Sequence, residues 1–168
     1  MTSPALVHPT SRAPSGSSAI SLWITAGALL FIVALAGSAA VVPRLRVLHF
    51  FQALLYVAVA VMARRGSAMA FGAGTVVAIA WNGLQLFITH NMQAGARLLW
   101  SYAHTGAATR IDTMLVFVGG VGHFILIAAS VTAFLISRPN GRAWRDFGLG
   151  GLFGLLYMAA IIAAFLPR

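Results

Sequence analysis

The chain has 168 residues, of which 60% are hydrophobic and only 8% are charged. A soluble domain usually carries about 25% charged residues, and several apolar runs here are long enough to cross a bilayer. All eleven basic residues are arginine and they form no continuous face, which argues against a nucleic-acid partner. The absence of cysteine and lysine excludes thiol and Schiff-base chemistry. The composition therefore predicts an all-α polytopic membrane protein.

The first 18 residues are rich in Ser, Thr and Pro, which predicts a disordered N-terminal tail. The rest of the chain, residues 19–168, is expected to form a single transmembrane domain. Its apolar runs are separated by short segments that contain Pro, Gly and Arg. These breaks predict a bundle of five transmembrane helices, at about residues 19–42, 47–63, 68–90, 113–136 and 147–166.

The long segment between the third and fourth predicted helices mixes polar and aromatic residues. Trp100 and Tyr102 lie beside Arg97, and Trp and Tyr favour the headgroup region of a bilayer. We therefore expect a short interfacial helix over residues 94–104. Five spans put the two termini on opposite sides. A small excess of Arg in the loops on the N-terminal side predicts a cytoplasmic N-terminus, with a bacterial inner membrane as the expected location.

A stripe of polar side chains in the third predicted helix is the best clue to function. Asn82, Gln85, Thr89 and Gln93 fall in a narrow sector at about 100° per residue of an ideal α-helix. Amide side chains facing hydrocarbon are costly, so this stripe must face protein or water. Two readings follow, namely the wall of a polar cavity or a set of hydrogen bonds that hold helices together.

Two other predicted helices carry polar residues, most of them in the same half of the bilayer. His49, Gln52 and Tyr56 share one face near the start of the second helix. His123, within the sequence Gly-Gly-Val-Gly-His, lies about ten residues into the fourth helix, or roughly 15 Å, close to the bilayer midplane. A histidine at the midplane is a functional candidate, and the alternative is a neutral imidazole bonded to Asn82, Gln85 or a carbonyl.

These stripes predict a polar cleft between the second, third and fourth helices, open on the outer side. We expect it to bind or pass a small amphipathic ligand such as a lipid headgroup or a quinone. The predicted ligand-binding residues are those of the three stripes: His49, Gln52, Tyr56, Asn82, Gln85, Thr89 and His123. The predicted cleft mouth is formed by Arg44, Arg46, His90 and Asp112.

Other functions remain open at this stage. A haem b or quinone redox subunit would use His123 and His49, although these residues are expected at different depths. No regular metal-ligand spacing is present, and the predicted spans contain no carboxylate and no catalytic motif, so we expect no metal site and favour a non-enzymatic role. A non-catalytic accessory subunit is the other alternative. The expected partners are membrane lipids, together with a partner membrane subunit or a second copy of the chain.

Overall fold

The computed structural model describes residues 16–107 and 109–165, and within them it contains helices and no strand. Five helices are long and apolar enough to cross a membrane, which confirms the expected all-α architecture and indicates an integral membrane protein. The elements in chain order are α1 (Gly16–Val41), the 3-10 turn η1 (Pro43–Leu45), α2 (Arg46–Ala63), α3 (Ala68–Gly83), the π-helical turn η2 (Leu84–Ile88), α4 (Asn91–Thr105), α5 (Ile111–Ile136) and α6 (Gly141–Phe165).

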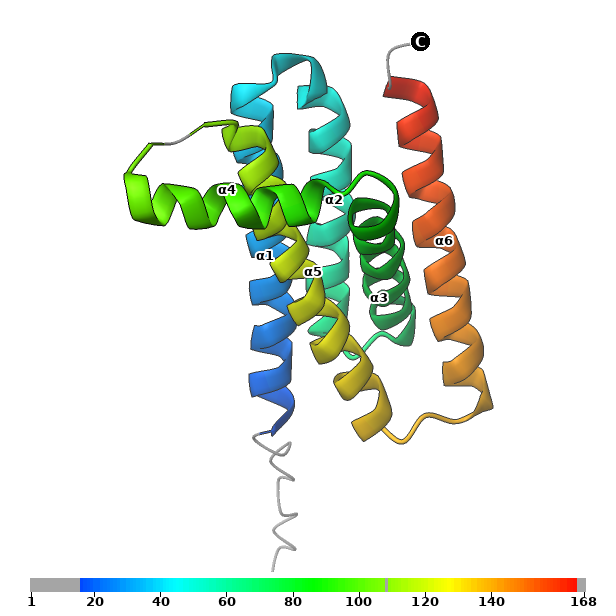
Figure 1. Ribbon diagram of the computed structural model, residues 1–168. Helices are drawn as coiled ribbons and strands as arrows, with labels where there is room; N and C mark the ends of the chain where they lie inside the picture. The colour runs from blue at the N-terminus through cyan, green and yellow to red at the C-terminus, as the bar shows by residue number, and fades with distance from the viewer. Residues whose placement is uncertain (1–15, 108, 166–168) are drawn as a thin grey trace, which may run out of the picture.

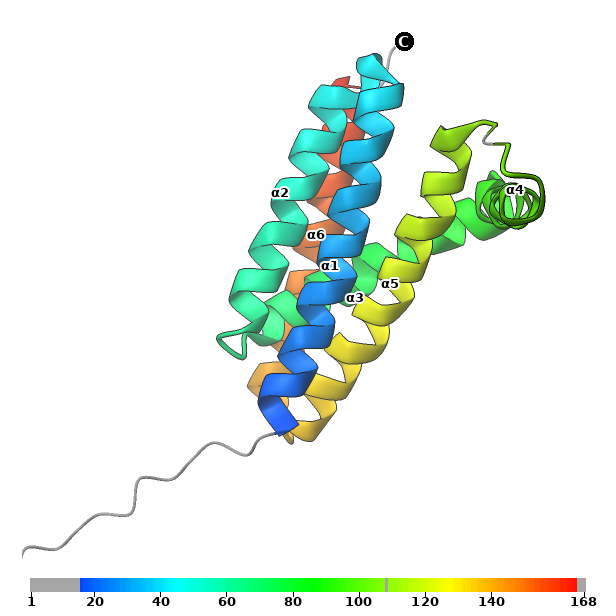
Figure 2. The same ribbon diagram turned by 90° about the vertical axis from the view of Figure 1, so that its left-hand side faces the viewer.

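The five long helices run up and down between the two ends of the bundle (Figures 1 and 2). α1 begins at one end and α6 ends at the other, as an odd number of spans requires. α1 lies between α2 and α5 and packs most extensively against α5, whereas α3 packs against α6, α5 and α2. α4 runs across the direction of the other helices and packs against the N-terminal part of α5 (Figure 1).

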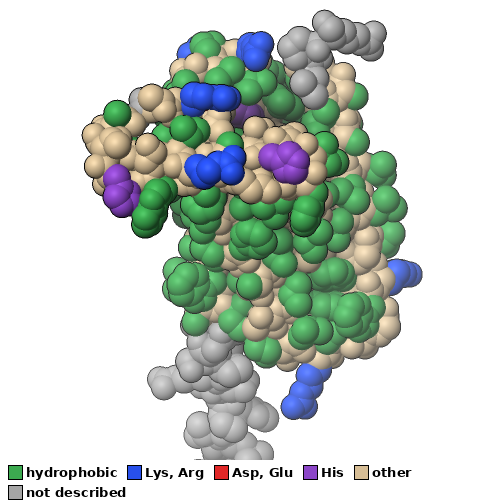
Figure 3. Space-filling view, in the orientation of Figure 1, with side chains coloured by type: hydrophobic (Ala, Val, Ile, Leu, Met, Phe, Trp, Pro, Cys, Tyr) green, Lys and Arg blue, Asp and Glu red, His purple; other side chains and the backbone are tan. Residues whose placement is uncertain are grey.

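Side chains of the long helices present a largely apolar surface, as lipid exposure requires. Leu22, Val33, Leu152 and Leu156 are each more than half exposed. In Figure 3 hydrophobic side chains cover the middle of the visible face, while basic and histidine side chains gather over α4 and basic side chains also mark the opposite end. This distribution matches a bundle whose two ends meet the headgroups.

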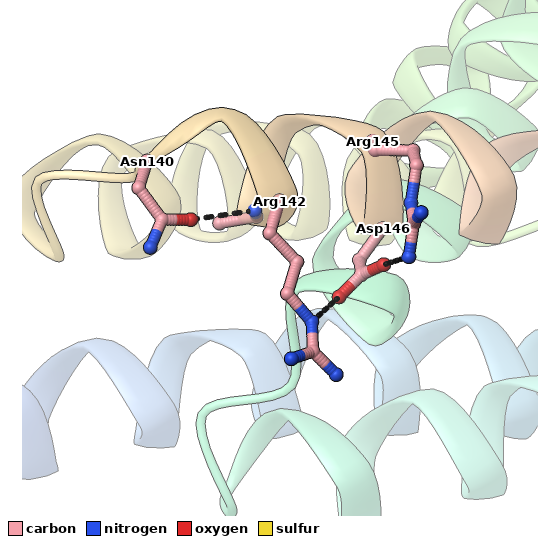
Figure 4. A network of polar contacts seen from close by, with 5 residues as sticks. Asn140, Arg142, Arg145 and Asp146 are labelled. Carbon is pink, nitrogen blue, oxygen red and sulfur yellow. Dashed lines mark hydrogen bonds and ion pairs between the residues drawn. The ribbon is translucent and has the colours of Figure 1, made fainter.

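The start of α6 differs from the prediction. The polar segment before Phe147 was expected to be a turn, yet the helix begins at Gly141. The Oδ1 atom of Asn140 accepts a hydrogen bond from the backbone N–H of Ala143 at 2.9 Å, which satisfies a donor at the helix start. Arg142 and Asp146 then form an i,i+4 ion pair at 4.0 Å, and these contacts extend α6 by more than one turn (Figure 4).

Other boundaries differ by smaller amounts. α1 begins at Gly16, so the last three residues of the predicted tail belong to a helix, and the remaining tail residues lie outside the described part of the chain. α1 ends at Val41, α2 begins at Arg46 and α5 begins at Ile111, each within two residues of its predicted limit. The predicted end of the last helix at residue 166 also lies outside the described residues.

Small residues bring α3 and α6 into close contact. A Cβ atom on Gly150 would overlap the backbone of Met69, and one on Gly72 would overlap the backbone of Phe147. Helices in lipid associate largely through such close packing of small residues. Gly148 lies on the exposed face of the same helix, and a Cβ atom there would meet nothing within 4 Å.

We expect Gly150→Ala to lower the free energy of unfolding by about 1–3 kcal/mol, because the added methyl group forces two backbones apart. The matched control, Gly148→Ala, should leave stability unchanged or raise it slightly, since alanine favours the helix. Denaturant titration of the purified protein in detergent, followed by circular dichroism, measures both effects. Equal stability of the two variants would contradict this packing.

Candidate functional site

The predicted third helix changes its geometry just after Asn82. α3 ends at Gly83 and continues as the π-helical turn η2, in which the backbone N–H of Thr89 donates to the carbonyl of Leu84 at 3.0 Å. A π-turn contains an extra residue, so the side chains beyond it leave the face that an ideal α-helix would give them. The predicted stripe is therefore divided, and Asn82 is separated from Thr89 and Gln93.

The end of this helix also differs from the prediction, because it stops at Ile88 rather than at residue 90. His90 has a left-handed backbone (φ 55°), and α4 begins at the next residue in a new direction. The side chain of Gln93 reaches back from α4, and its Nε2 atom donates to the carbonyl of Leu86 at 2.6 Å. Gln93 thus stabilises the corner between η2 and α4.

Asn82 and His123 form a hydrogen bond in the interior of the bundle. The two side chains are 3% and 0% exposed, and the distance from His123 Nδ1 to Asn82 Oδ1 is 3.2 Å. The Nδ2 atom of Asn82 donates to the carbonyl of Gly120 at 3.3 Å. A carbonyl only accepts hydrogen bonds, so the amide NH₂ group must face Gly120 and the amide oxygen must face His123.

This orientation of Asn82 determines the tautomer of the histidine. Because Asn82 Oδ1 is an acceptor, His123 Nδ1 must carry the hydrogen, which leaves a lone pair on Nε2 of the neutral ring. His123 Nε2 is buried and has no hydrogen-bond partner among the described residues. The site therefore contains an unused acceptor deep in the bundle, and such groups are costly unless a ligand or water satisfies them.

Three aromatic side chains enclose the imidazole. Phe31 of α1 stacks on His123 with 3.9 Å between ring centroids, and Tyr56 of α2 is nearly parallel to it at 5.3 Å. Trp81 of α3 presents an edge-to-face contact at 5.0 Å. The cluster of Phe31, Tyr56, Trp81, Asn82 and His123, hereafter the imidazole cluster, therefore joins α1, α2, α3 and α5.

Sequence reasoning did not identify the contribution of Phe31. α1 has no strongly polar stripe, and Phe31 is one of many apolar residues in it. The sequence feature that could have indicated it is a pair of glycines, Gly27 in α1 and Gly122 in α5. A Cβ atom on Gly27 would lie 2.7 Å from the carbonyl oxygen of Gly122. The small residues before His123 thus admit the backbone of α1, and this close approach places Phe31 against the imidazole.

A small pocket adjoins the imidazole cluster. It has a cavity volume of about 50 Å³ and is bounded by α1, α2, α3 and α5. Phe31 and Trp81 form one wall, and its polar lining comes from Ser38, His49 and Asp112. This pocket, hereafter the mouth pocket, shares two aromatic rings with the imidazole cluster.

The structure brings only part of the predicted site together. Tyr56, Asn82 and His123 belong to the imidazole cluster, and His49 and Asp112 line the mouth pocket. Gln52 is buried, and its Oε1 atom has no partner among the described residues. α1 is an additional wall of the site that was not expected. The other predicted residues do not line the mouth pocket: Arg44, Arg46, Gln85, Thr89 and His90.

These remaining residues have local roles instead. Arg46 is exposed, and its Nε atom donates to the carbonyl of Ala39 at 3.1 Å. The hydroxyl of Thr89 donates to Gln85 Oε1 at 2.8 Å on the exposed side of η2. His90 Nδ1 lies 3.0 Å from the carbonyl of Leu86. Asp112, and no arginine, is the charged residue that lines the mouth pocket.

The arrangement does not fit a haem b or a metal ion. Phe31 stacks directly on His123, and the adjoining 50 Å³ pocket is far smaller than the roughly 300–1,000 Å³ of typical cofactor sites. Within residues 16–107 and 109–165, no group of three or more His, Asp or Glu side chains could hold a metal ion. The polar atoms of this site instead suit a small polar group that lies between the aromatic rings.

Comparisons with protein-family models, with curated proteins and with solved structures find no match for this chain. A functional assignment therefore depends on the chemistry of the imidazole cluster and the mouth pocket. Both features are formed by side chains from the same four helices.

We expect Asn82→Ala to lower the free energy of unfolding by about 1–2 kcal/mol, because it leaves the Nδ1–H group of His123 unpaired in the interior. Gln85→Ala is the matched control, since its partner Thr89 is exposed, and it should have little effect. A double-mutant cycle with His123→Ala should show coupling between residues 82 and 123. Additive effects of these two substitutions would contradict the hydrogen bond.

Proposed function

We propose that this integral membrane protein binds a small amphipathic ligand, whose polar group enters the mouth pocket while its apolar part remains in the bilayer. The observation that carries the proposal is the buried, unpaired Nε2 atom of His123, whose ring contacts Phe31 and Trp81, the two aromatic side chains that also line the mouth pocket. If the interior of the bundle had no role beyond packing, an apolar side chain would be expected at position 123.

The available groups favour a ligand that donates hydrogen bonds. His123 Nε2 and the carboxylate of Asp112 are acceptors, whereas Ser38 and His49 can each donate or accept. A hydroxyl group suits these acceptors, and it could belong to a lipid headgroup, a quinol or another amphipathic metabolite. In this proposal the hydroxyl enters from the mouth pocket beside Phe31 and Trp81 and meets His123 Nε2 in the plane of the imidazole ring, where its lone pair lies.

The ends of the bundle support an orientation in the membrane. Arg64, Arg65, Arg138, Arg142 and Arg145 lie at the end where α1 begins, and the positive-inside rule favours this end as cytoplasmic. The mouth pocket would then open toward the outer side. In the same proposal α4 lies at headgroup level, because its exposed face carries Arg97, Trp100 and Tyr102.

An accessory subunit is a second candidate function, and the Asn82–His123 hydrogen bond favours it. This bond joins α3 to α5 within the bundle, and such bonds between helices stabilise folds in lipid without any ligand. Under this alternative, substitutions in the imidazole cluster change stability or assembly and leave no binding activity to lose. The two candidates therefore differ in whether a hydroxyl ligand protects the mouth pocket.

The chain has no cysteine, so a single Ser38→Cys variant carries a unique thiol in the mouth pocket. We expect a water-soluble thiol reagent to label it, and 1-decanol to slow labelling several-fold because its hydroxyl donates to the pocket acceptors. The methyl ether of decanol has the same chain but no donor, and it should not protect. Ser130→Cys is the buried control and should remain unlabelled, since residue 130 is 0% exposed.

Mass spectrometry of the labelled protein measures the rate. Equal protection by the alcohol and by its ether would overturn the proposed donor specificity. A thiol at position 38 that reacts with the reagent but is protected by neither compound would instead favour the accessory subunit.

A further inference from the structure

A second pocket lies at the opposite end of the bundle, where α1 begins. It has a cavity volume of about 450 Å³, within the range of ligand sites in proteins. Its apolar floor includes Ile24, Phe71 and Ala133, and Ile24 and Phe71 are 1% and 5% exposed. Arg64, Gly66 and Ser137 supply its polar side at the ends of α2 and α5. We call this feature the basal pocket.

Among the described residues, no ion pair balances the charge of Arg64 at the basal pocket. The chain has two acidic residues, Asp112 and Asp146. Asp112 lines the mouth pocket at the other end, and Asp146 pairs with Arg142 and Arg145 at 4.0 and 3.6 Å. Neither carboxylate forms an ion pair with Arg64, which is exposed at the basal pocket.

Two further arginines add to this positive charge. Arg65 follows Arg64 in the turn after α2, and Arg138 follows Ser137 at the end of α5. An anion from outside the chain would satisfy these side chains. In a bilayer the anion at the level of helix ends is the phosphate of a phospholipid, and arginine binds phosphate in a planar, two-bonded arrangement.

We propose that the basal pocket binds one anionic phospholipid, with part of an acyl chain on the apolar floor and the phosphate against Arg64. The floor supplies hydrocarbon contact and the arginines supply the charge. A zwitterionic phospholipid fits less well because its own ammonium group is repelled by the neighbouring arginines. This lipid site is separate from the mouth pocket and does not depend on the ligand proposed there.

Native mass spectrometry of the purified full-length protein, titrated with phosphatidylglycerol or phosphatidylcholine, tests this site. We expect one phosphatidylglycerol to bind more tightly than phosphatidylcholine. Arg64→Gln should weaken its binding about fivefold, the effect of one arginine near a charged headgroup. Ala133→Phe should abolish binding because the larger side chain fills the floor. Arg110→Gln is the matched control at the opposite end and should bind as the wild type does.

Circular dichroism of each variant checks that it remains folded, and Arg64→Gln changes an exposed side chain. The proposal is overturned if Arg64→Gln and Ala133→Phe retain phosphatidylglycerol as the wild type does, or if both lipids bind equally. Dimers that disappear in Ala133→Phe would show that a second copy occupies the pocket. Tighter lipid binding after removal of residues 2–15 would show that the chain's own N-terminal segment occupies it, and either result also overturns the proposal.

Discussion

The hydrogen bond from Asn82 to the carbonyl of Gly120 determines the chemistry of the interior. It fixes the direction of the amide, the amide fixes the tautomer of His123, and the tautomer leaves an acceptor on Nε2. In a bilayer no bulk water reaches such a group, so each unpaired polar atom has a larger effect than it would at a soluble protein's surface. The ligand proposal follows from this sequence of constraints.

The close approach of α1 to α5 is the second requirement. Glycines on both helices let the backbones meet, and Phe31 then lies flat on the imidazole. With α1 in this position, the polar interior is divided into an enclosed imidazole cluster and a small mouth pocket. The same four helices therefore form both the imidazole cluster and the mouth pocket.

The sequence was sufficient to predict the five membrane-length helices, because long apolar runs broken by Pro, Gly and Arg have few other interpretations. It also indicated that Asn82 and His123 could be bonded to each other. It could not predict the π-helical turn after Gly83, since the face assigned to Thr89 assumed an ideal α-helix. Nor could it predict Phe31, because nothing in a single apolar helix shows which ring will meet the imidazole. The early start of α6 depended on Asn140 as a cap, a signal that was present but was interpreted as part of a turn.

The protonation of the His123 ring decides whether the interior of the bundle holds a free hydrogen-bond acceptor. Nitrogen-15 NMR of the histidine side chains, with His123 assigned by comparison with the His123→Gln variant, distinguishes a protonated ring nitrogen from one with a lone pair. We expect a neutral ring with hydrogen on Nδ1 and a lone pair on Nε2, whose signal shifts when 1-decanol is added. A ring with hydrogen on Nε2, or an Nε2 signal that does not respond to the alcohol, would contradict this expectation.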